Sequence, residues 1–350
     1  MDVVTEFRYE RHESIDGGEG QNSIGVFRAT DLHLKAEIAV KEIEKAKFRD
    51  PSTFFQEAEA MFRSENPHVV AIRTATQTPD RICLGMPYYR GGSLAGRIGK
   101  NPLSLCDVLR IGREALAGLG AIHAAGTVHL DVKPSNILFD DNGAAMIADF
   151  GQARELDARG VVRLPARMYA PIVPPEATSG SWHGTVMSDI YQMGVTLYRA
   201  ANGNRMFESQ LSAVDPLEWN SRIASGKLPR RDCFMPHVPA VLRRIIRKAM
   251  NIDATKRFPS AIEFANALAR VKPGNDWSAT CETNRTKWVA TRKGQPDLSV
   301  ELRVNGSSCS VEIHTVNSGR RRRSRSSLWR DNLSLANADS YLSQLFATLR

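Results

Sequence analysis

The sequence predicts an α+β protein: strands dominate the first part, helices the middle, and a small antiparallel sheet with a helix closes the chain. Residues 14–43 are expected to form strands around a glycine-rich loop, because turn residues separate the apolar runs. Residues 53–63 and 107–123 carry apolar side chains at helical spacing and are therefore expected to be helices. After Pro273-Gly274 the pattern changes to the alternation of half-buried strands.

Polar side chains that could carry chemistry are concentrated in two short segments, residues 129–138 (HLDVKPSNIL) and residues 149–151 (DFG). Apolar runs on both sides of an intervening turn predict a hairpin, which would bring Asn136 and Asp149 side by side. An amide and a carboxylate held together suit Mg²⁺, which prefers hard oxygen ligands, so these two residues are the predicted metal ligands. Asp131 lies one short loop away, where it could accept a proton from an incoming hydroxyl.

The order and spacing of these segments resemble the catalytic loop and the metal-binding triplet of eukaryotic-like (Hanks-type) protein kinases. The similarity extends over about residues 8–271. It implies a bilobal protein-kinase fold, with a small β-rich N-terminal lobe and a larger helical C-terminal lobe. It also implies a protein substrate, ATP as the phosphate donor and Mg²⁺ as the metal, with Mn²⁺ as an alternative. The sequence has Lys133 two residues after Asp131. In this feature it resembles serine/threonine kinases rather than tyrosine kinases.

The same resemblance implies the roles of individual side chains. Lys41 would bind the α- and β-phosphates, and Glu57 would hold it in place by an ion pair. Glu59 lies on the same predicted helix and is a competing candidate for that pair. Asp131 would orient and deprotonate the acceptor hydroxyl, while Lys133 would neutralise the γ-phosphate. The residues implied to contact the nucleotide are Gly18, Gly20, Val26, Ala39, Lys41, Met86, Tyr88 and Tyr89.

Four further residues are implied to be structural rather than chemical. His129 and Asp189 would each fix the backbone of the catalytic loop. Arg257 resembles the late arginine of kinases that pairs with the glutamate of an Ala-Pro-Glu motif, which is Glu176 in this sequence.

Two other functions remain open on the sequence alone. The first is a pseudokinase or ATP-binding scaffold, which is favoured by two departures from the family pattern: Ser23 replaces the third glycine of the loop, and Tyr169 replaces a threonine. The complete set of polar groups that the chemistry requires argues against it. The second is a kinase for a small-molecule alcohol, which shares the fold but usually lacks so complete a protein-kinase motif set.

Two observations predict that activity does not require phosphorylation of the activation segment, residues 149–176. Many kinases carry an arginine just before the catalytic aspartate, and it pairs with a phosphate on that segment. Leu130 occupies this position and cannot make charge-assisted hydrogen bonds. The segment contains no serine or threonine, and Tyr169 is its only hydroxyl side chain.

A boundary is predicted at Pro273-Gly274, which divides the chain into a kinase domain, residues 1–272, and a small module, residues 273–350. Alternating patterns in the module predict an antiparallel sheet of three or four strands, and Asn305-Gly306 is typical of a hairpin turn between two of them. Apolar residues at helical spacing in residues 339–349 predict a helix that covers the sheet. The module resembles no family that we recognise.

The formal net charge of +9 is concentrated near the C-terminus, where residues 273–350 carry twelve lysines and arginines against seven aspartates and glutamates. The run Arg320–Arg325 is expected to be a solvated loop, and an acidic protein or a nucleic acid is a rarer alternative partner. Apolar runs are too short to cross a membrane, and the acidic N-terminus is not a signal peptide, so a cytoplasmic protein with reduced cysteines is expected.

Overall fold

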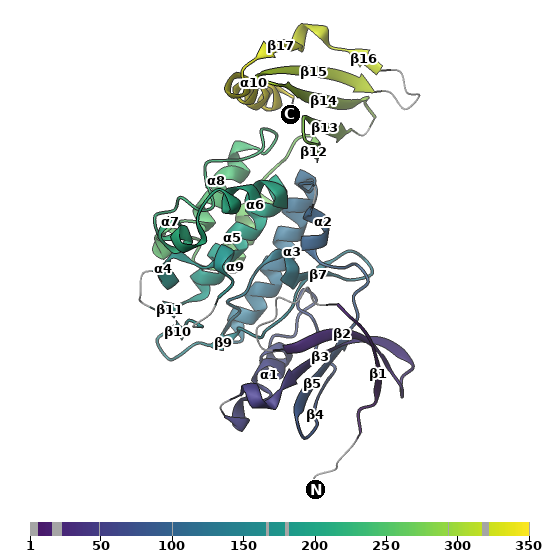
Figure 1. Ribbon diagram of the computed structural model, residues 1–350, viewed down its shortest axis with the longest axis vertical. Coiled ribbons are helices and arrows are strands. Elements are labelled where there is room, and N and C mark those ends of the chain that lie inside the picture. The colour runs from purple at the N-terminus through teal and green to yellow at the C-terminus, as the bar shows by residue number, and fades with distance from the viewer. Residues whose placement is uncertain are drawn as a thin grey trace.

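The computed structural model of the chain describes residues 6–15, 23–48, 50–99, 101–165, 168–178, 182–292, 294–316 and 322–349. Figure 1 shows three parts along the long axis: a β-rich lobe that contains the N-terminus, a helical lobe in the middle, and a small sheet with a helix at the other end. This arrangement confirms the predicted bilobal α+β fold with a C-terminal sheet and helix. Among the described helices, none combines the length and the apolar character needed to cross a membrane.

The N-terminal lobe is an antiparallel sheet in the order β1-β2-β3-β5-β4. Its strands are β1 (Tyr9–Ser14), β2 (Ser23–Asp31), β3 (Ala36–Glu44), β4 (Thr74–Gln77) and β5 (Arg81–Pro87). Helix α1 (Gln56–Arg63) buries Ala58, Ala60 and Met61. This helix begins later than the predicted residue 53, because residues 51–53 form a separate 3₁₀ turn.

The C-terminal lobe is organised around α5, which is buried at every residue from Ser188 to Asn202. A helix buried on all sides is typical of the centre of a large core. Its helices are α2 (Leu94–Ile98), α3 (Leu105–Ala124), α4 (Pro175–Thr178), α5 (Val186–Asn202), α6 (Asn204–Ser212), α7 (Trp219–Ala224), α8 (Ala240–Ala249) and α9 (Ala261–Ala269). Its paired strands are β6 (Thr127–Val128) with β9 (Arg154–Glu155), β7 (Ile137–Phe139) with β8 (Ala145–Ile147), and β10 (Val162–Arg163) with β11 (His183–Gly184).

The C-terminal part has more strands than the three or four predicted. Its six-stranded sheet has the order β12-β13-β14-β15-β16, and β17 also pairs with β15. The strands are β12 (Asp276–Cys281), β13 (Arg285–Thr291), β14 (Asp297–Asn305), β15 (Ser308–Val316), β16 (Arg322–Ser324) and β17 (Arg330–Leu333), and the helix is α10 (Leu335–Thr348). The predicted hairpin is confirmed, since Asn305 pairs with Ser308 and Gly306 takes a φ of 62°, which glycine adopts without strain.

The basic run does not form the continuous loop that we expected. Residues 322–324 form β16, whose backbone pairs with residues 314–316 of β15, because a strand edge offers hydrogen bonds that offset the mutual repulsion of arginines. Arg320 and Arg321 lie outside the described residues.

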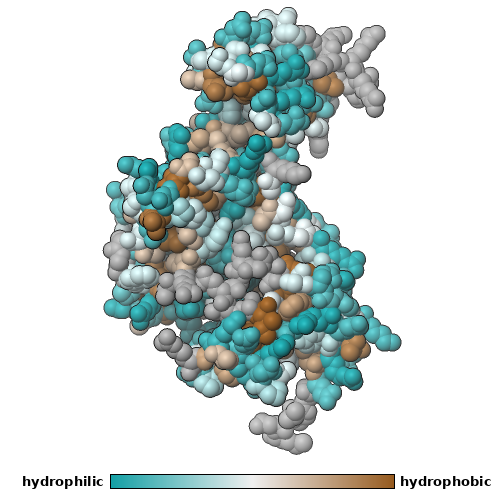
Figure 2. All heavy atoms as spheres, in the orientation of Figure 1, coloured by the Kyte–Doolittle hydropathy of each residue, from teal (hydrophilic) through white to brown (hydrophobic). Residues whose placement is uncertain are grey.

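The core of the C-terminal sheet is continuous with the core of the helical lobe. Trp288 of β13 donates a hydrogen bond from Nε1 to Nδ1 of His237, at 3.0 Å, and the rings of His237 and Phe346 meet edge to face. The backbone N–H of Cys281 donates to Oδ1 of Asn101 at 2.8 Å. In Figure 2, hydrophobic side chains gather on this part of the molecule where α10 covers the sheet. The module is therefore packed on the helical lobe at the end away from the β-rich lobe (Figure 1).

We predict that residues 273–350 are a separate folding unit, so a chain that ends at Lys272 should still bind ATP with Mg²⁺. The shortened chain loses the hydrogen bond from Trp288 to His237 and exposes the apolar surface that the module covered, so its melting temperature should be lower than that of the full chain. Calorimetry and nucleotide titration on the two chains measure both quantities. A shortened chain that cannot fold or bind nucleotide would contradict the boundary.

Candidate active site

Lys41 is the buried centre of an ion-pair group that joins both lobes. Its Nζ lies 2.6 Å from Oε1 of Glu57 on α1 and 2.7 Å from Oδ1 of Asp149. Glu59, the competing candidate, is exposed to solvent, because the other face of α1 packs on the sheet. Burial alone would lower the pKa of Lys41, but the negative charges of Asp149 and Glu57 outweigh it and raise that pKa. The lysine is therefore a permanent cation at this position.

The two carboxylates beside Lys41 respond differently to their surroundings. Burial raises the pKa of Glu57 in spite of the adjacent lysine. Burial acts in the same direction on Asp149, but the charge of Lys41 lowers the pKa of Asp149 to about 2. Asp149 also takes a left-handed φ of 65°, and Gly151 donates its N–H to Oδ1 of Asp149 at 3.3 Å. An unfavourable backbone conformation that is held by surrounding contacts is common at functional sites.

Asp189, at the start of α5, fixes the backbone of the catalytic loop, as predicted. Its carboxylate accepts hydrogen bonds from the N–H groups of His129, at 2.8 Å, and Leu130, at 2.7 Å. His123 of α3 lies 2.8 Å from the same carboxylate. Leu130 has a left-handed φ of 63°, which a leucine adopts only when its surroundings hold it there.

Gln192 and Thr196 complete this anchor, and neither was expected from the sequence. The side chain of Gln192 accepts from the N–H of Val132 at 3.0 Å and donates to the carbonyl of Leu130 at 2.9 Å. Thr196 donates to the carbonyl of Val132 at 3.1 Å. Their spacing from Asp189 places all three on one face of a helix. Polar residues at that spacing in an otherwise apolar helix are the signal that could have identified them.

Asp131 is buried, and only one of its carboxylate oxygens is engaged. Lys133 Nζ lies 3.0 Å from Oδ2, and Nδ2 of Asn136 donates to the same oxygen at 2.9 Å. The N–H of Asp131 donates to Nδ1 of His129, so the proton of this imidazole is on Nε2, which donates to the carbonyl of Ala148. Within the described part of the chain, Oδ1 of Asp131 has no hydrogen bond. This oxygen is therefore free to accept a proton.

Asn136 and Asp149 lie at the same end of the β7–β8 hairpin, as predicted. The N–H of Ala148 donates to the carbonyl of Asn136 at 2.9 Å, which places Asp149 one residue beyond the paired position. The amide nitrogen of Asn136 is turned to Asp131, so its Oδ1 faces away from that carboxylate. Lys41 binds only one oxygen of Asp149. An amide oxygen and a carboxylate oxygen form a donor set that fits Mg²⁺.

The strands of the N-terminal lobe place two of the predicted nucleotide-contacting residues beside Lys41. Val26 on β2 lies opposite Lys41 on β3, and Ala39 lies opposite Met86 on β5. Side chains alternate between the two faces of a strand, so Ala39 and Lys41 share one face of β3. That face is the one that meets Asp149.

Two more of the residues implied to contact the nucleotide follow β5. Tyr88 and Tyr89 lie in the segment that leaves the sheet and leads to α2, and Tyr89 packs against the main core. Burial raises the pKa of Tyr89. Gly18 and Gly20, the glycines predicted to cover the phosphates, lie outside the described residues.

The activation segment is held against the catalytic loop by an apolar cluster. Leu130 packs with Val128, Val162 and Leu164, and each of these side chains is at most 3% exposed. β9 pairs with β6 just before the catalytic loop, and the N–H of Leu164 donates to the carbonyl of Trp182 at 2.8 Å. Leu130 stands just before the catalytic aspartate, where many kinases have an arginine. It is thus part of a small apolar core.

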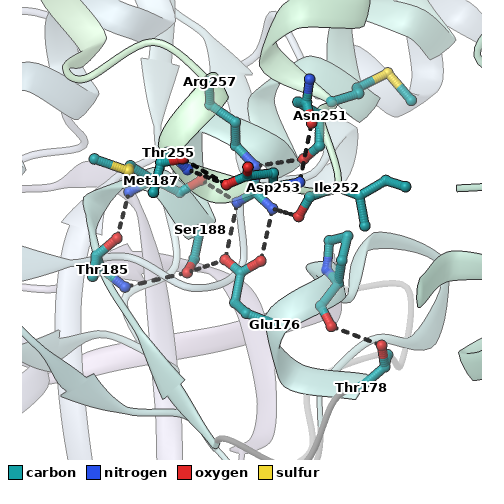
Figure 3. Close-up of polar contacts among 12 residues, drawn as sticks. Glu176, Thr178, Thr185, Met187, Ser188, Asn251, Ile252, Asp253, Thr255 and Arg257 are labelled. Atoms are coloured by element: carbon teal, nitrogen blue, oxygen red, sulfur yellow. Dashed lines mark hydrogen bonds and ion pairs between the residues drawn. The ribbon is translucent and has the colours of Figure 1, made fainter. Parts of the chain in front are cut away.

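The far end of the activation segment is anchored by a two-pronged ion pair, as predicted. Nη1 and Nη2 of Arg257 donate to the two carboxylate oxygens of Glu176 at 2.9 and 2.7 Å (Figure 3). Ser188 at the start of α5 donates to the same carboxylate at 2.7 Å. Burial would raise the pKa of Glu176, but the hydrogen bonds from Arg257 lower it below its usual value.

Tyr169 contacts the catalytic loop through its ring. Lys133 Nζ lies 5.1 Å from the centre of the Tyr169 ring, within the range of a cation–π interaction. The sequence identified Tyr169 as the residue in place of a threonine, but no local pattern signals this contact.

We expect Arg257→Gln to lower the free energy of unfolding at neutral pH by about 1.5–3 kcal/mol, because the partly buried Glu176 carboxylate would lose its charge-assisted hydrogen bonds from Arg257. The lowered pKa of Glu176 stabilises the fold above the pKa of the unfolded state, about 4.3, and this contribution is lost as the pH falls through the folded-state pKa. The difference between wild type and variant should therefore shrink below about pH 4.3. Urea titrations at several pH values measure it. Lys256→Gln is the control, since this exposed neighbour loses the same charge; an equal effect in both variants would contradict the assignment.

Comparison with known proteins agrees with this geometry. Residues 9–268 match the model of the protein kinase domain family. Serine/threonine-protein kinase PknK of Mycobacterium tuberculosis is 32% identical over 82% of this chain, and serine/threonine-protein kinase PknA of Corynebacterium glutamicum is 32% identical over 71%. The matches cover 26% and 54% of the lengths of these two relatives, so the chain spans about half of their length or less. Protein kinases use ATP and a divalent metal. The chain belongs to the protein kinase domain family.

Proposed function

We propose that the protein is an ATP- and Mg²⁺-dependent kinase that transfers the γ-phosphate of ATP to serine or threonine hydroxyls of a protein substrate. The observation that carries this proposal is the simultaneous pairing of Lys41 with Glu57 and Asp149. The pairs bring α1, β3 and the Asp-Phe-Gly triplet together, which an active phosphoryl-transfer site requires. A scaffold that only bound nucleotide would not need this whole set of charges.

Catalysis would rest on positioning and charge neutralisation. The free Oδ1 of Asp131 accepts the proton of the substrate hydroxyl, whose oxygen forms a bond to the γ-phosphorus. The bond from that phosphorus to the β–γ bridging oxygen breaks, and ADP leaves with the bonding electrons. Lys41 orients the α- and β-phosphates, and Lys133 offsets negative charge on the transferred group. Asn136 and Asp149 would hold Mg²⁺, which neutralises phosphate charge when bound.

Each of Lys41→Met, Asp131→Asn and Asp149→Asn should lower phosphate transfer by about 10²–10⁴-fold while the protein stays folded. The reason is that each removes a charge that acts on the reacting groups rather than on the core. Transfer from radiolabelled ATP to a generic serine-rich protein measures the effect, and circular dichroism measures folding. Asp141→Asn, in the exposed hairpin turn, makes the same chemical change as a control. Near-normal turnover in a folded variant would refute the role of that residue. A wild-type protein that binds ATP but transfers nothing would favour the scaffold.

The second part of the proposal is that this kinase is active without phosphorylation of its activation segment. A phosphate orders that segment in other kinases by pairing with an arginine. The corresponding side chain, Leu130, is buried among Val162 and Leu164, and apolar burial can supply the same order without a charge. The ion pair of Glu176 with Arg257 supports the other end of the segment.

Phosphatase-treated protein and the Tyr169→Phe variant should retain transfer activity within about twofold, because the ring over Lys133 is kept while the hydroxyl is removed. Leu164→Ala should lower activity and increase protease cleavage of the segment, since a Leu→Ala change in a core costs about 2–5 kcal/mol. Initial rates and limited proteolysis are the measurements. Activity that is lost on phosphatase treatment and regained after incubation with ATP would show that the switch lies in this segment.

A further inference from the structure

Positive charge outside the C-terminal module is concentrated in residues 230–248, which include α8. This stretch carries six lysines and arginines against one aspartate, a net charge of +5, which equals that of residues 273–350. Because the whole chain carries +9, the rest of it is close to neutral. The helix itself contains four of the cations and no acidic residue. A surface field of one sign attracts partners of the opposite sign.

The exposed side of α8 is formed by cations. The helix buries its apolar side chains, which are Leu242, Ile245, Ile246 and Ala249. Its amphipathic pattern therefore leaves Arg244, Arg247 and Lys248 exposed to solvent. Residues three and four positions apart are neighbours on a helix surface, so Arg244 is adjacent to both of the others. Arg243 is not counted with them, because its guanidinium donates to backbone carbonyls.

Arg231 extends this surface at the C-terminal end of the helix. Nε of Arg247 donates to the carbonyl of Arg231 at 2.9 Å, so the two residues are in direct contact. Nη1 of Arg231 in turn donates to the carbonyl of Met250, the residue after α8, at 2.9 Å. We call Arg231, Arg244, Arg247 and Lys248 the α8 patch.

Two cations of the α8 patch are held in place by rings, and none is paired with a carboxylate. The guanidinium of Arg247 lies 5.6 Å from the centre of the Phe234 ring, and Nζ of Lys248 lies 4.3 Å from the centre of the Phe258 ring. In the described part of the chain, no carboxylate forms an ion pair with any member of the patch, although other exposed cations of this lobe are paired. Side chains that are already ordered lose less entropy when they bind a partner.

We propose that the α8 patch is a docking site for an acidic segment of a protein substrate. The planar guanidinium groups of Arg244 and Arg247 suit the carboxylates of aspartate and glutamate, to which arginine can donate two parallel hydrogen bonds. Single-stranded nucleic acid fits less well, because it also uses exposed aromatic rings for base stacking. The rings at this patch, Phe234 and Phe258, are only 6% and 5% exposed.

The assignment of a substrate rests on the proposed function and deepens it. α8 packs against α5, the helix whose Asp189 binds the catalytic loop (Figure 1). A substrate that is held on this lobe stays near the active site, which raises its local concentration there. Docking outside the reacting groups therefore lowers KM and leaves kcat unchanged.

Fluorescence anisotropy of labelled hexaglutamate with the full chain measures docking without any catalysis. The variant Arg244→Gln/Arg247→Gln/Lys248→Gln should weaken binding by about tenfold or more, as expected for the loss of three exposed ion pairs. The matched control is a triple glutamine variant that removes three charges from the other basic stretch, at Arg320, Arg321 and Arg322. This control should change the affinity by less than about twofold. Equal weakening by both triple variants would show attraction by net charge alone and would overturn the patch.

A single exposed position keeps the test decisive if the triple variant unfolds. Arg244→Glu should weaken hexaglutamate binding by about fivefold, whereas Arg244→Lys keeps the charge and should stay within about twofold of wild type. A wild-type chain that does not bind at low salt, where charges are least screened, would overturn the site. Hexauridylate that binds more tightly than hexaglutamate would overturn the assignment to a protein segment.

Phosphate transfer to a serine-rich protein with and without a hexaglutamate tail measures the effect on catalysis. The tail should lower KM by about tenfold in wild type but not in the triple α8 variant, with kcat unchanged in both. A tail that binds but leaves KM unchanged would overturn the assignment to a substrate. A wild type that binds hexaglutamate and transfers no phosphate would contradict the proposed function, whereas the binding measurement would still support the docking site.

Discussion

The buried carboxylate of Asp189 is the constraint on which the geometry of the active site depends. An ionised group without water needs hydrogen bonds on both oxygens, and the N–H groups of His129 and Leu130 supply them from the catalytic loop. This requirement holds Leu130 in a left-handed conformation that it would otherwise avoid. The loop then turns so that Asp131 meets Lys133 and presents one unbound oxygen.

The same helix, α5, also supports the activation segment. Ser188, the residue before Asp189, donates to the carboxylate of Glu176, and Arg257 adds a hydrogen bond to the carbonyl of Met187 (Figure 3). The catalytic loop and the end of the activation segment are thus bonded to the first turns of one buried helix. Packed helices are rigid, so the two loops keep a fixed relation to each other.

The C-terminal module is joined to the helical lobe by a mixed apolar and polar contact. Trp288, Trp277 and Phe346 extend the apolar core across the joint. The hydrogen bond from Trp288 to His237 fixes how these two rings face each other, because an indole N–H must find an acceptor when it is buried. The protein therefore has a second buried polar centre, separate from the catalytic one.

Local patterns in the sequence were sufficient for features that depend on neighbouring residues. The spacing of Asn136 and Asp149 across a hairpin, and the Asn305-Gly306 turn, follow from turn chemistry and alternation. The distances from Asp131 to its polar neighbours follow from the short loop that contains them. The fold class could be predicted because the family motifs occur in order along most of the chain.

Only the tertiary structure decided which distant groups meet. The rotation of α1 against β3 selects Glu57 over Glu59, and the pair of Lys41 with Asp149 joins residues from different lobes. The β16 strand likewise exists because β15 offers it an edge. Periodicity reports which side of an element is apolar but not which partner covers it, since that choice depends on packing across the whole chain. The contact of His237 with Trp288 has no local signal for this reason, whereas the catalytic residues lie in short motifs whose order the sequence already displays.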